Sequence, residues 1–158
     1  MPTKQKPSHW HAYYWRGQRS TYDQEAARRP TMLHNVENIQ PSQEFMLNEC
    51  PPLEIAHWLL RPPRMIKETF DGEAADQVAE WFRKAVEEAA TSFAAERDRE
   101  PDQIEYRVAM ARETASWGGD VYATWYLHGK GFLALSVIGC SPNWSSPGLP
   151  CPQKRGRQ

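Results

Sequence analysis

The sequence predicts an α+β fold in which a long amphipathic helix packs on a small antiparallel β-meander, with extended basic tails at both ends. Three observations support this class. Apolar residues recur at three- and four-residue spacing over 73–99, apolar and polar residues alternate over 104–111, and two apolar runs flank a glycine-containing turn over 121–140. The first pattern is typical of a helix, and the other two are typical of strands.

Length and composition predict one domain. The chain has 158 residues, of which 40% are hydrophobic and 25% are charged, which is enough for a single core. Prolines gather near both ends. We therefore divide the chain into a basic aromatic N-terminal arm (1–40), an α+β domain (41–141) and a proline-rich basic C-terminal tail (142–158).

The formal net charge of −1 conceals an uneven distribution. Residues 1–30 carry six lysines and arginines against two acidic residues, and residues 151–158 carry three basic residues and no acidic one. Residues 31–150 consequently hold eight more acidic than basic residues. An acidic body with basic ends indicates that the ends either fold back on it or reach an anionic partner.

The helix is expected from about Glu73 to Arg99, where Pro101 ends it. Asp71 is the expected N-cap, because its carboxylate can accept a backbone N–H of the first turn. The apolar stripe consists of Val78, Trp81, Phe82, Ala85, Val86, Ala89, Phe93 and Ala94. Such a stripe predicts one face buried against a sheet.

The strands are expected after this helix. Ile104, Tyr106, Val108 and Met110 alternate with residues that suit solvent, which predicts a half-buried strand. The following run, 121–140, predicts a hairpin closed by a type II′ turn on Gly129-Lys130.

The register of that hairpin follows from its turn. Leu127 would oppose Phe132, and Trp125 would oppose Ala134. The second face would then carry Tyr122, Tyr126, Leu133, Leu135 and Val137. Because both faces would be apolar, we expect the hairpin to be covered on two sides.

Residues 44–70 are the expected second cover. The stretch EFMLNEC suggests a strand, and PLEIAHWLL suggests a short apolar helix that starts at Pro52 and ends before Pro62-Pro63. Another protein could cover this face instead.

The arm contains the stretch SHWHAYYWRGQR, whose single aliphatic residue is Ala12. Three interpretations stay open: the arm packs on its own domain, it docks on another protein, or it binds nucleic acid by stacking on bases and pairing with phosphates. Its candidate contact residues are Trp10, Tyr13, Tyr14, Trp15, Arg16 and Arg19.

A metal site is not predicted. His9 and His11 would point the same way in an extended segment, but two ligands do not make a site. Cys50, Cys140 and Cys151 are an odd number without close spacing, so we also expect no disulfide framework and no cofactor.

A catalytic site is not predicted either. Glu54-x-x-His57 occurs once, and the glycines around His128 suit a turn better than a phosphate loop. A small enzyme is kept as an alternative hypothesis, because several reactive side chains would have to converge at one end of the sheet. They are Cys140, His128, His57, Asp120, Glu113 and Arg112.

The expected function is therefore that of a non-enzymatic binding or accessory protein. Its two candidate contact surfaces are the aromatic basic arm and the apolar sheet face of Tyr122, Tyr126, Leu133, Leu135 and Val137. A protein partner or homo-oligomer is favoured over nucleic acid, because tryptophan and tyrosine dominate the arm and the acidic body would repel phosphates. We expect no membrane contact and a cytoplasmic location, since the longest apolar run, at 132–135, is too short to span a bilayer and no export signal is present.

Overall fold

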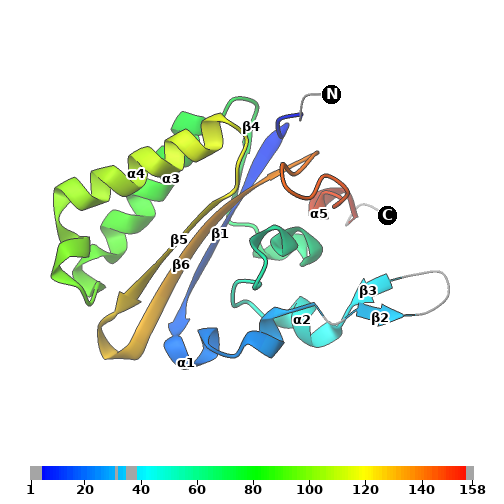
Figure 1. The fold of residues 1–158 in the computed structure, drawn as a ribbon, viewed down its shortest axis with the longest axis horizontal. Coiled ribbons are helices and arrows are strands. Elements are labelled where there is room, and N and C mark those ends of the chain that lie inside the picture. The colour runs from blue at the N-terminus through cyan, green and yellow to red at the C-terminus, as the bar shows by residue number, and fades with distance from the viewer. Residues whose placement is uncertain (1–4, 31, 35–38, 156–158) are drawn as a thin grey trace.

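The computed structural model of the chain describes residues 5–30, 32–34 and 39–155. Its centre is a four-stranded antiparallel sheet with the strand order β4-β1-β6-β5 (Figure 1). The strands are β1 (His9–Gln18), β4 (Glu68–Asp71), β5 (Val121–Leu127) and β6 (Gly131–Cys140). The predicted α+β class is confirmed.

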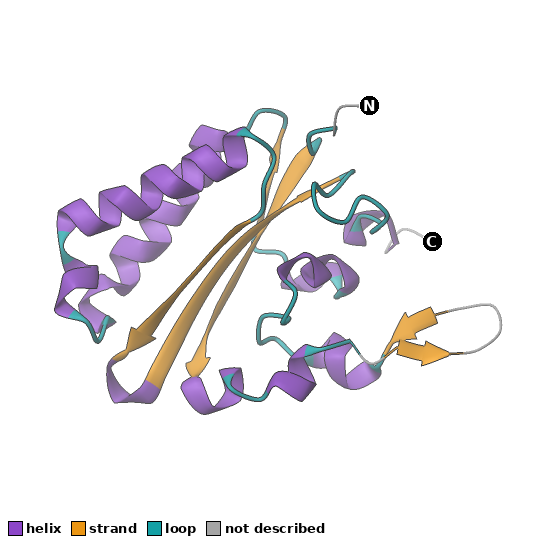
Figure 2. Ribbon diagram, viewed as in Figure 1, coloured by secondary structure: helices purple, strands orange, loops and turns teal. Residues whose placement is uncertain are grey.

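Two helices cover one face of the sheet. They are α3 (Ala75–Ala89) and α4 (Pro101–Ser116), and they lie together on the same side (Figure 2). Between them and the sheet lies the larger apolar core, which includes Trp10, Phe70, Val78, Phe82, Val86, Phe93, Ile104, Val108, Trp125, Leu133, Leu135 and Val137. Removal of this apolar surface from water is the main force that holds the helices on the sheet.

Short elements and loops cover the other face. In chain order they are α1 (Arg19–Tyr22), the 3-10 helix η1 (Glu25–Arg28), α2 (Gln43–Leu47), the 3-10 helices η2 (Ile55–Leu60) and η3 (Pro63–Met65), and α5 (Pro152–Arg155). A two-stranded sheet of β2 (Met32–His34) and β3 (Ile39–Pro41) extends from this side (Figure 1). The smaller core here contains Tyr13, Trp58, Leu59, Met65 and Ile138. Region 44–70 thus supplies part of the second cover, as its composition predicts.

The strand predicted around 104–111 is wrong, because this segment lies in α4. Ile104 and Val108 are buried on the sheet side of the helix, whereas Tyr106 and Met110 are exposed. Each pair has helical four-residue spacing, but the two pairs are offset by two residues. Their superposition produces the same alternation as a half-buried strand.

The single helix predicted over 73–99 is interrupted. It ends at Ala89 and is followed by the 3-10 helices η4 (Ala90–Ser92) and η5 (Glu96–Arg99). Ala94 N donates a 2.9 Å hydrogen bond to Tyr126 O, next to an isolated β-bridge. The chain leaves the helix because its backbone pairs with the edge of β5.

The expected N-cap at Asp71 is also wrong. Asp71 is the last residue of β4, and the N-cap position of α3 is Ala74. The segment before α3 therefore contributes a sheet strand, which the sequence pattern did not indicate.

The predicted hairpin is present, but its register is shifted by one residue. A three-residue loop, η6 (His128–Lys130), replaces the two-residue turn, with Gly129 at φ +71°. Trp125 accordingly pairs with Leu133 instead of Ala134. A one-residue shift moves every side chain of β6 to the opposite face relative to β5.

The sheet also contains a strand that the sequence pattern did not predict, because the aromatic stretch of the N-terminal arm forms β1 at its centre. It pairs with β6 over ten residues and with β4 over four. The candidate strand EFMLNEC instead contains α2, whose N-cap Ser42 accepts a hydrogen bond from Phe45 N. Residues 1–4 of the expected arm and 156–158 of the expected tail lie outside the described residues.

No helix in the described part of the chain has the length and apolarity needed to cross a bilayer.

Candidate metal centre

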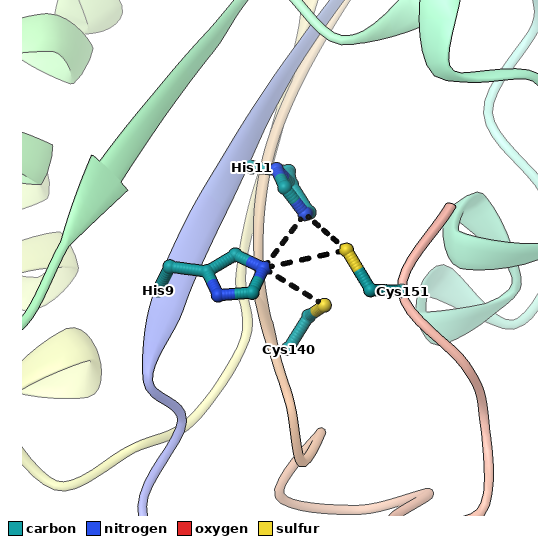
Figure 3. Close-up of side chains that lie close together, drawn as sticks. All are labelled: His9, His11, Cys140 and Cys151. Atoms are coloured by element: carbon teal, nitrogen blue, oxygen red, sulfur yellow. Dashed lines mark hydrogen bonds between the residues drawn. The ribbon is translucent and has the colours of Figure 1, made fainter. Parts of the chain in front are cut away.

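Two histidines and two cysteines meet at one end of the sheet (Figure 3). His9 and His11 come from the start of β1, and Cys140 is the last residue of β6. Cys151 arrives from the C-terminal segment, just before α5. Their four ligand atoms all lie within 4.8 Å of one another.

The sheet register explains three of these positions. His9 and His11 are two residues apart on one strand, so their side chains leave the same face. His9 is directly opposite Cys140 in the β1–β6 ladder, and His11 is opposite Ile138. Cys140 therefore projects beside His9 on the face turned away from α3 and α4.

The distances between the ligand atoms are short. His9 Nε2 lies 3.1 Å from His11 Nε2, 3.1 Å from Cys140 Sγ and 3.5 Å from Cys151 Sγ. His11 Nε2 lies 3.6 Å from Cys151 Sγ. The four atoms therefore enclose one point instead of forming a chain (Figure 3).

These distances agree with those of a tetrahedral zinc site. Zn–N bonds of about 2.0–2.1 Å and Zn–S bonds of about 2.3 Å place two nitrogens about 3.4 Å apart and a nitrogen and a sulfur about 3.6 Å apart. The observed nitrogen–nitrogen distance of 3.1 Å and nitrogen–sulfur distances of 3.1–3.6 Å need only small shifts to match.

Neighbouring hydroxyl groups orient both imidazole rings. Ser8 Oγ lies 3.0 Å from His9 Nδ1, and Thr69 Oγ1 lies 3.0 Å from His11 Nδ1. When each hydroxyl accepts the Nδ1–H proton, both Nε2 lone pairs face the centre of the cluster. Partners of this kind fix the tautomer of metal-binding histidines.

Burial favours the uncharged form of the deepest histidine. Side-chain burial, reinforced by the nearby His9, lowers the pKa of His11 to about 4, and the carboxylate of Asp71 opposes this shift only partly. His11 is fully buried, as is Cys140, while Cys151 is 5% exposed. A neutral imidazole is the form that coordinates a metal.

A buried asparagine fastens the segment that carries Cys151. Asn143 Nδ2 donates to both carboxylate oxygens of Asp120, at 3.0 and 3.1 Å, and to Gly139 O at 2.7 Å. Its Oδ1 accepts the backbone N–H of Ser146 at 3.0 Å. The turn after β6 is thereby fixed, and the chain returns toward β1.

The donor set indicates which metal fits. Two imidazole nitrogens and two thiolates in a tetrahedral arrangement suit zinc, whereas magnesium and calcium prefer oxygen ligands. Four protein ligands close the coordination shell, which is typical of a structural site.

The structure separates the candidate contact residues of the arm. Trp10 and Tyr13 are buried in the two cores, Trp15 is partly buried, and Tyr14 is 37% exposed. Arg16 and Arg19 are exposed. The full set is therefore not one accessible surface, because alternate side chains of β1 point to opposite faces of the sheet.

The apolar sheet face predicted for binding is not one surface either. Leu133 and Leu135 are fully buried beneath the helices, as is Val137. Tyr122 and Tyr126 belong to the opposite face of β5 and are 40% and 54% exposed. The shifted hairpin register causes this separation.

The reactive residues named for the enzyme hypothesis are dispersed. His128 is at the hairpin loop, ten or more residues along β6 from Cys140. His57 pairs with Glu54 at 3.2 Å, and Glu113 and Arg112 are on α4. Asp120 lies at the same end of the sheet as Cys140, where it accepts a hydrogen bond from Gly139 N.

The sequence shows the two alternate histidines, but no cysteine lies near them along the chain. A metal site was therefore not predicted. The two missing ligands are 131 and 142 residues from His9 along the chain. The available clue was the pair of alternate histidines in a chain that also has two cysteines near its other end. Scans of protein-family models, curated proteins and solved structures found no significant match to the chain.

Proposed function

We propose that this protein binds zinc through His9, His11, Cys140 and Cys151. The observation that carries the proposal is the convergence of two Nε2 and two Sγ atoms within 4.8 Å on one face of the sheet. The Nδ1 contacts to Ser8 and Thr69 add support, because they leave both Nε2 atoms directed at the centre.

The bound zinc would act as a structural cross-link between distant segments of the chain. Its ligands come from β1, the end of β6 and the C-terminal segment, so one ion would tie together parts of the chain that are far apart in sequence. Metal binding that requires the folded arrangement stabilises that arrangement. Without metal, two thiols and two imidazoles would crowd together in a largely buried position.

The test is metal content and affinity. We expect one zinc per chain by mass spectrometry of the purified protein, and one equivalent in competition titrations with a chromophoric chelator. Single alanine substitutions of His11 and Cys140 should remove most of this zinc.

Matched controls are available in the same chain. His128→Ala removes an exposed histidine at the hairpin loop, and Cys50→Ala removes a buried cysteine that is not part of the cluster. Both should retain full zinc content. Equal zinc loss in control and cluster variants, or wild-type protein without zinc affinity, would contradict the proposal.

A second candidate function is self-association, which follows the expected binding role but uses another surface. The exposed Tyr106 and Met110 on α4 and Tyr122 on β5 line one groove beside the edge of the sheet. Exposed apolar side chains that cluster next to the edge strand of a sheet are typical of a contact site.

Light scattering after size exclusion tests this second candidate. We expect wild-type protein to show a concentration-dependent dimer and Met110→Asp to stay a monomer with an unchanged circular dichroism spectrum. Glu113→Gln, on the same helix, is the matched control. A wild-type monomer at every concentration would contradict it.

A further inference from the structure

We infer that Cys151 is an exchangeable ligand and that the zinc held by His9, His11 and Cys140 accepts a small thiolate in its place. This inference rests on the proposed zinc function. It assigns an additional property to the same centre, namely binding of an external sulfur ligand.

Three ligands are held by the most regular part of the sheet. His9 and Cys140 are directly opposite each other in the β1–β6 ladder, and β1 is also paired with β4 over the same residues. His11 is opposite Ile138, which is fully buried. The backbone that carries these three ligands can therefore move only if the central strands open locally.

The fourth ligand has a different support. Cys151 lies eight residues beyond Asn143, the buried residue that fastens the segment to Asp120 and Gly139. Pro150 and Pro152 flank it, and neither has a backbone N–H to donate. Cys151 is buried in the smaller core, so its displacement requires the segment after the Asn143 turn to leave this core, while the sheet and the Asn143 turn stay intact.

One side of the cluster is closer to solvent than the other. His9 is partly exposed, whereas His11 and Cys140 are fully buried. Movement of Cys151 would open the cluster beside His9 first, and a small ligand could then reach the metal.

Exchange of one thiolate ligand for another changes no oxidation state and needs no oxidant. The Zn–S bond to Cys151 breaks and its sulfur takes up a proton, while an incoming thiol loses a proton and forms a new Zn–S bond. The product has three protein ligands and one external ligand, which is the coordination typical of zinc sites that bind substrates.

Cobalt substitution provides the first test, because each thiolate bound to Co²⁺ contributes a charge-transfer band. We expect Cys151→Ala to retain Co²⁺ with a weaker band and to regain the wild-type intensity when 2-mercaptoethanol is added. Cys140→Ala, the matched variant, should lose Co²⁺ binding and show no such rescue.

The outcomes distinguish the two proposals. Wild-type protein that does not bind Co²⁺ or Zn²⁺ would overturn the zinc function together with this inference. Normal wild-type binding with no thiol rescue in Cys151→Ala, or equal rescue in both variants, would overturn the exchange alone.

Alkylation of the wild-type zinc protein tests the same property without a substitution. With iodoacetamide and peptide mapping, we expect Cys151 to be modified first while one zinc per chain is retained. Cys50, buried and outside the cluster, serves as the internal reference for global opening. Release of zinc in step with the first modification, or modification of Cys140 ahead of Cys151, would overturn the inference.

Discussion

The two faces of the sheet are built from different chemistry. The helical face is almost entirely apolar, with α3 and α4 packed on Leu133, Leu135 and Val137. The opposite face contains several buried polar groups with specific partners, such as Ser136 Oγ, which accepts a 3.1 Å hydrogen bond from Trp58 Nε1. Burial of apolar surface area stabilises the packing on the helical face, whereas specific hydrogen bonds and ring contacts stabilise the other face.

A buried arginine illustrates the second kind of support. Arg61 is fully buried, donates to Cys50 O, and stacks on the rings of Phe45 and Trp58. Burial lowers its pKa to about 10, so it keeps its charge at neutral pH. The groups able to bind a ligand thus gather where loops, not regular helices, cover the sheet.

Metal removal should lower the stability of the protein more than any substitution discussed below. The loss should be confined to the loop-covered face of the sheet. If zinc is present at about 1,000 times its dissociation constant, it adds about 4 kcal/mol to the free energy of unfolding. After treatment with EDTA, we expect hydrogen exchange to increase over residues 8–12 and 138–153 and to change much less in α3. An equal increase in both regions would show that the faces are not independent.

A cavity on the helical face should lower the free energy of unfolding slightly less than metal removal does. This loss should be the same with and without zinc. Leu135 is fully buried, and Leu135→Ala should lower the free energy of unfolding by about 3 kcal/mol through lost burial and cavity formation. Denaturant titrations with and without EDTA should give the same loss. A loss that changes markedly on chelation would mean that the two faces are energetically coupled.

Removal of an orienting hydroxyl should weaken zinc binding moderately. Thr69→Val preserves the shape of the side chain but removes the oxygen 3.0 Å from His11 Nδ1. We expect a 10- to 100-fold loss of zinc affinity, or about 2 kcal/mol, and recovery in Thr69→Ser. Thr124→Val on β5 is the matched control, and an affinity loss of the same size there would argue against an orienting role.

The smallest effect concerns the turn that carries Cys151. Burial raises the pKa of Asp120, although its hydrogen bonds from Asn143 and Gly139 oppose the shift. The folded protein therefore binds this proton more tightly than the unfolded chain, and the associated stability, full below about pH 4, is lost as the pH rises through the folded pKa.

Asp120→Asn should flatten this part of the pH dependence of unfolding. Chemical denaturation between pH 4 and pH 8 measures the slope, and Asp76→Asn, which changes an exposed carboxylate on α3, is the control. An unchanged slope in Asp120→Asn would mean that this carboxyl group does not titrate differently in the folded protein.

Local patterns determined much of the helical face. The stripe from Val78 to Ala89, the two apolar strands of the hairpin and the need for cover on both sides follow from side-chain periodicity, which is a property of neighbouring residues. The same kind of pattern gave a wrong prediction at α4, where two helical stripes together produce the alternation of a strand. The predicted hairpin register was also wrong, because the loop at Gly129 contains one extra residue.

The metal cluster depended on the tertiary structure. The sequence itself determined that His9 and His11 would share a face once extended, because alternate residues of a strand do so. Only the pairing of β1 with β6 and the return of the C-terminal segment brought Cys140 and Cys151 to them. The physical reason is that a ligand set requires distances in space, and contacts between residues more than 130 positions apart are set by packing of the whole fold and leave no local periodicity to detect.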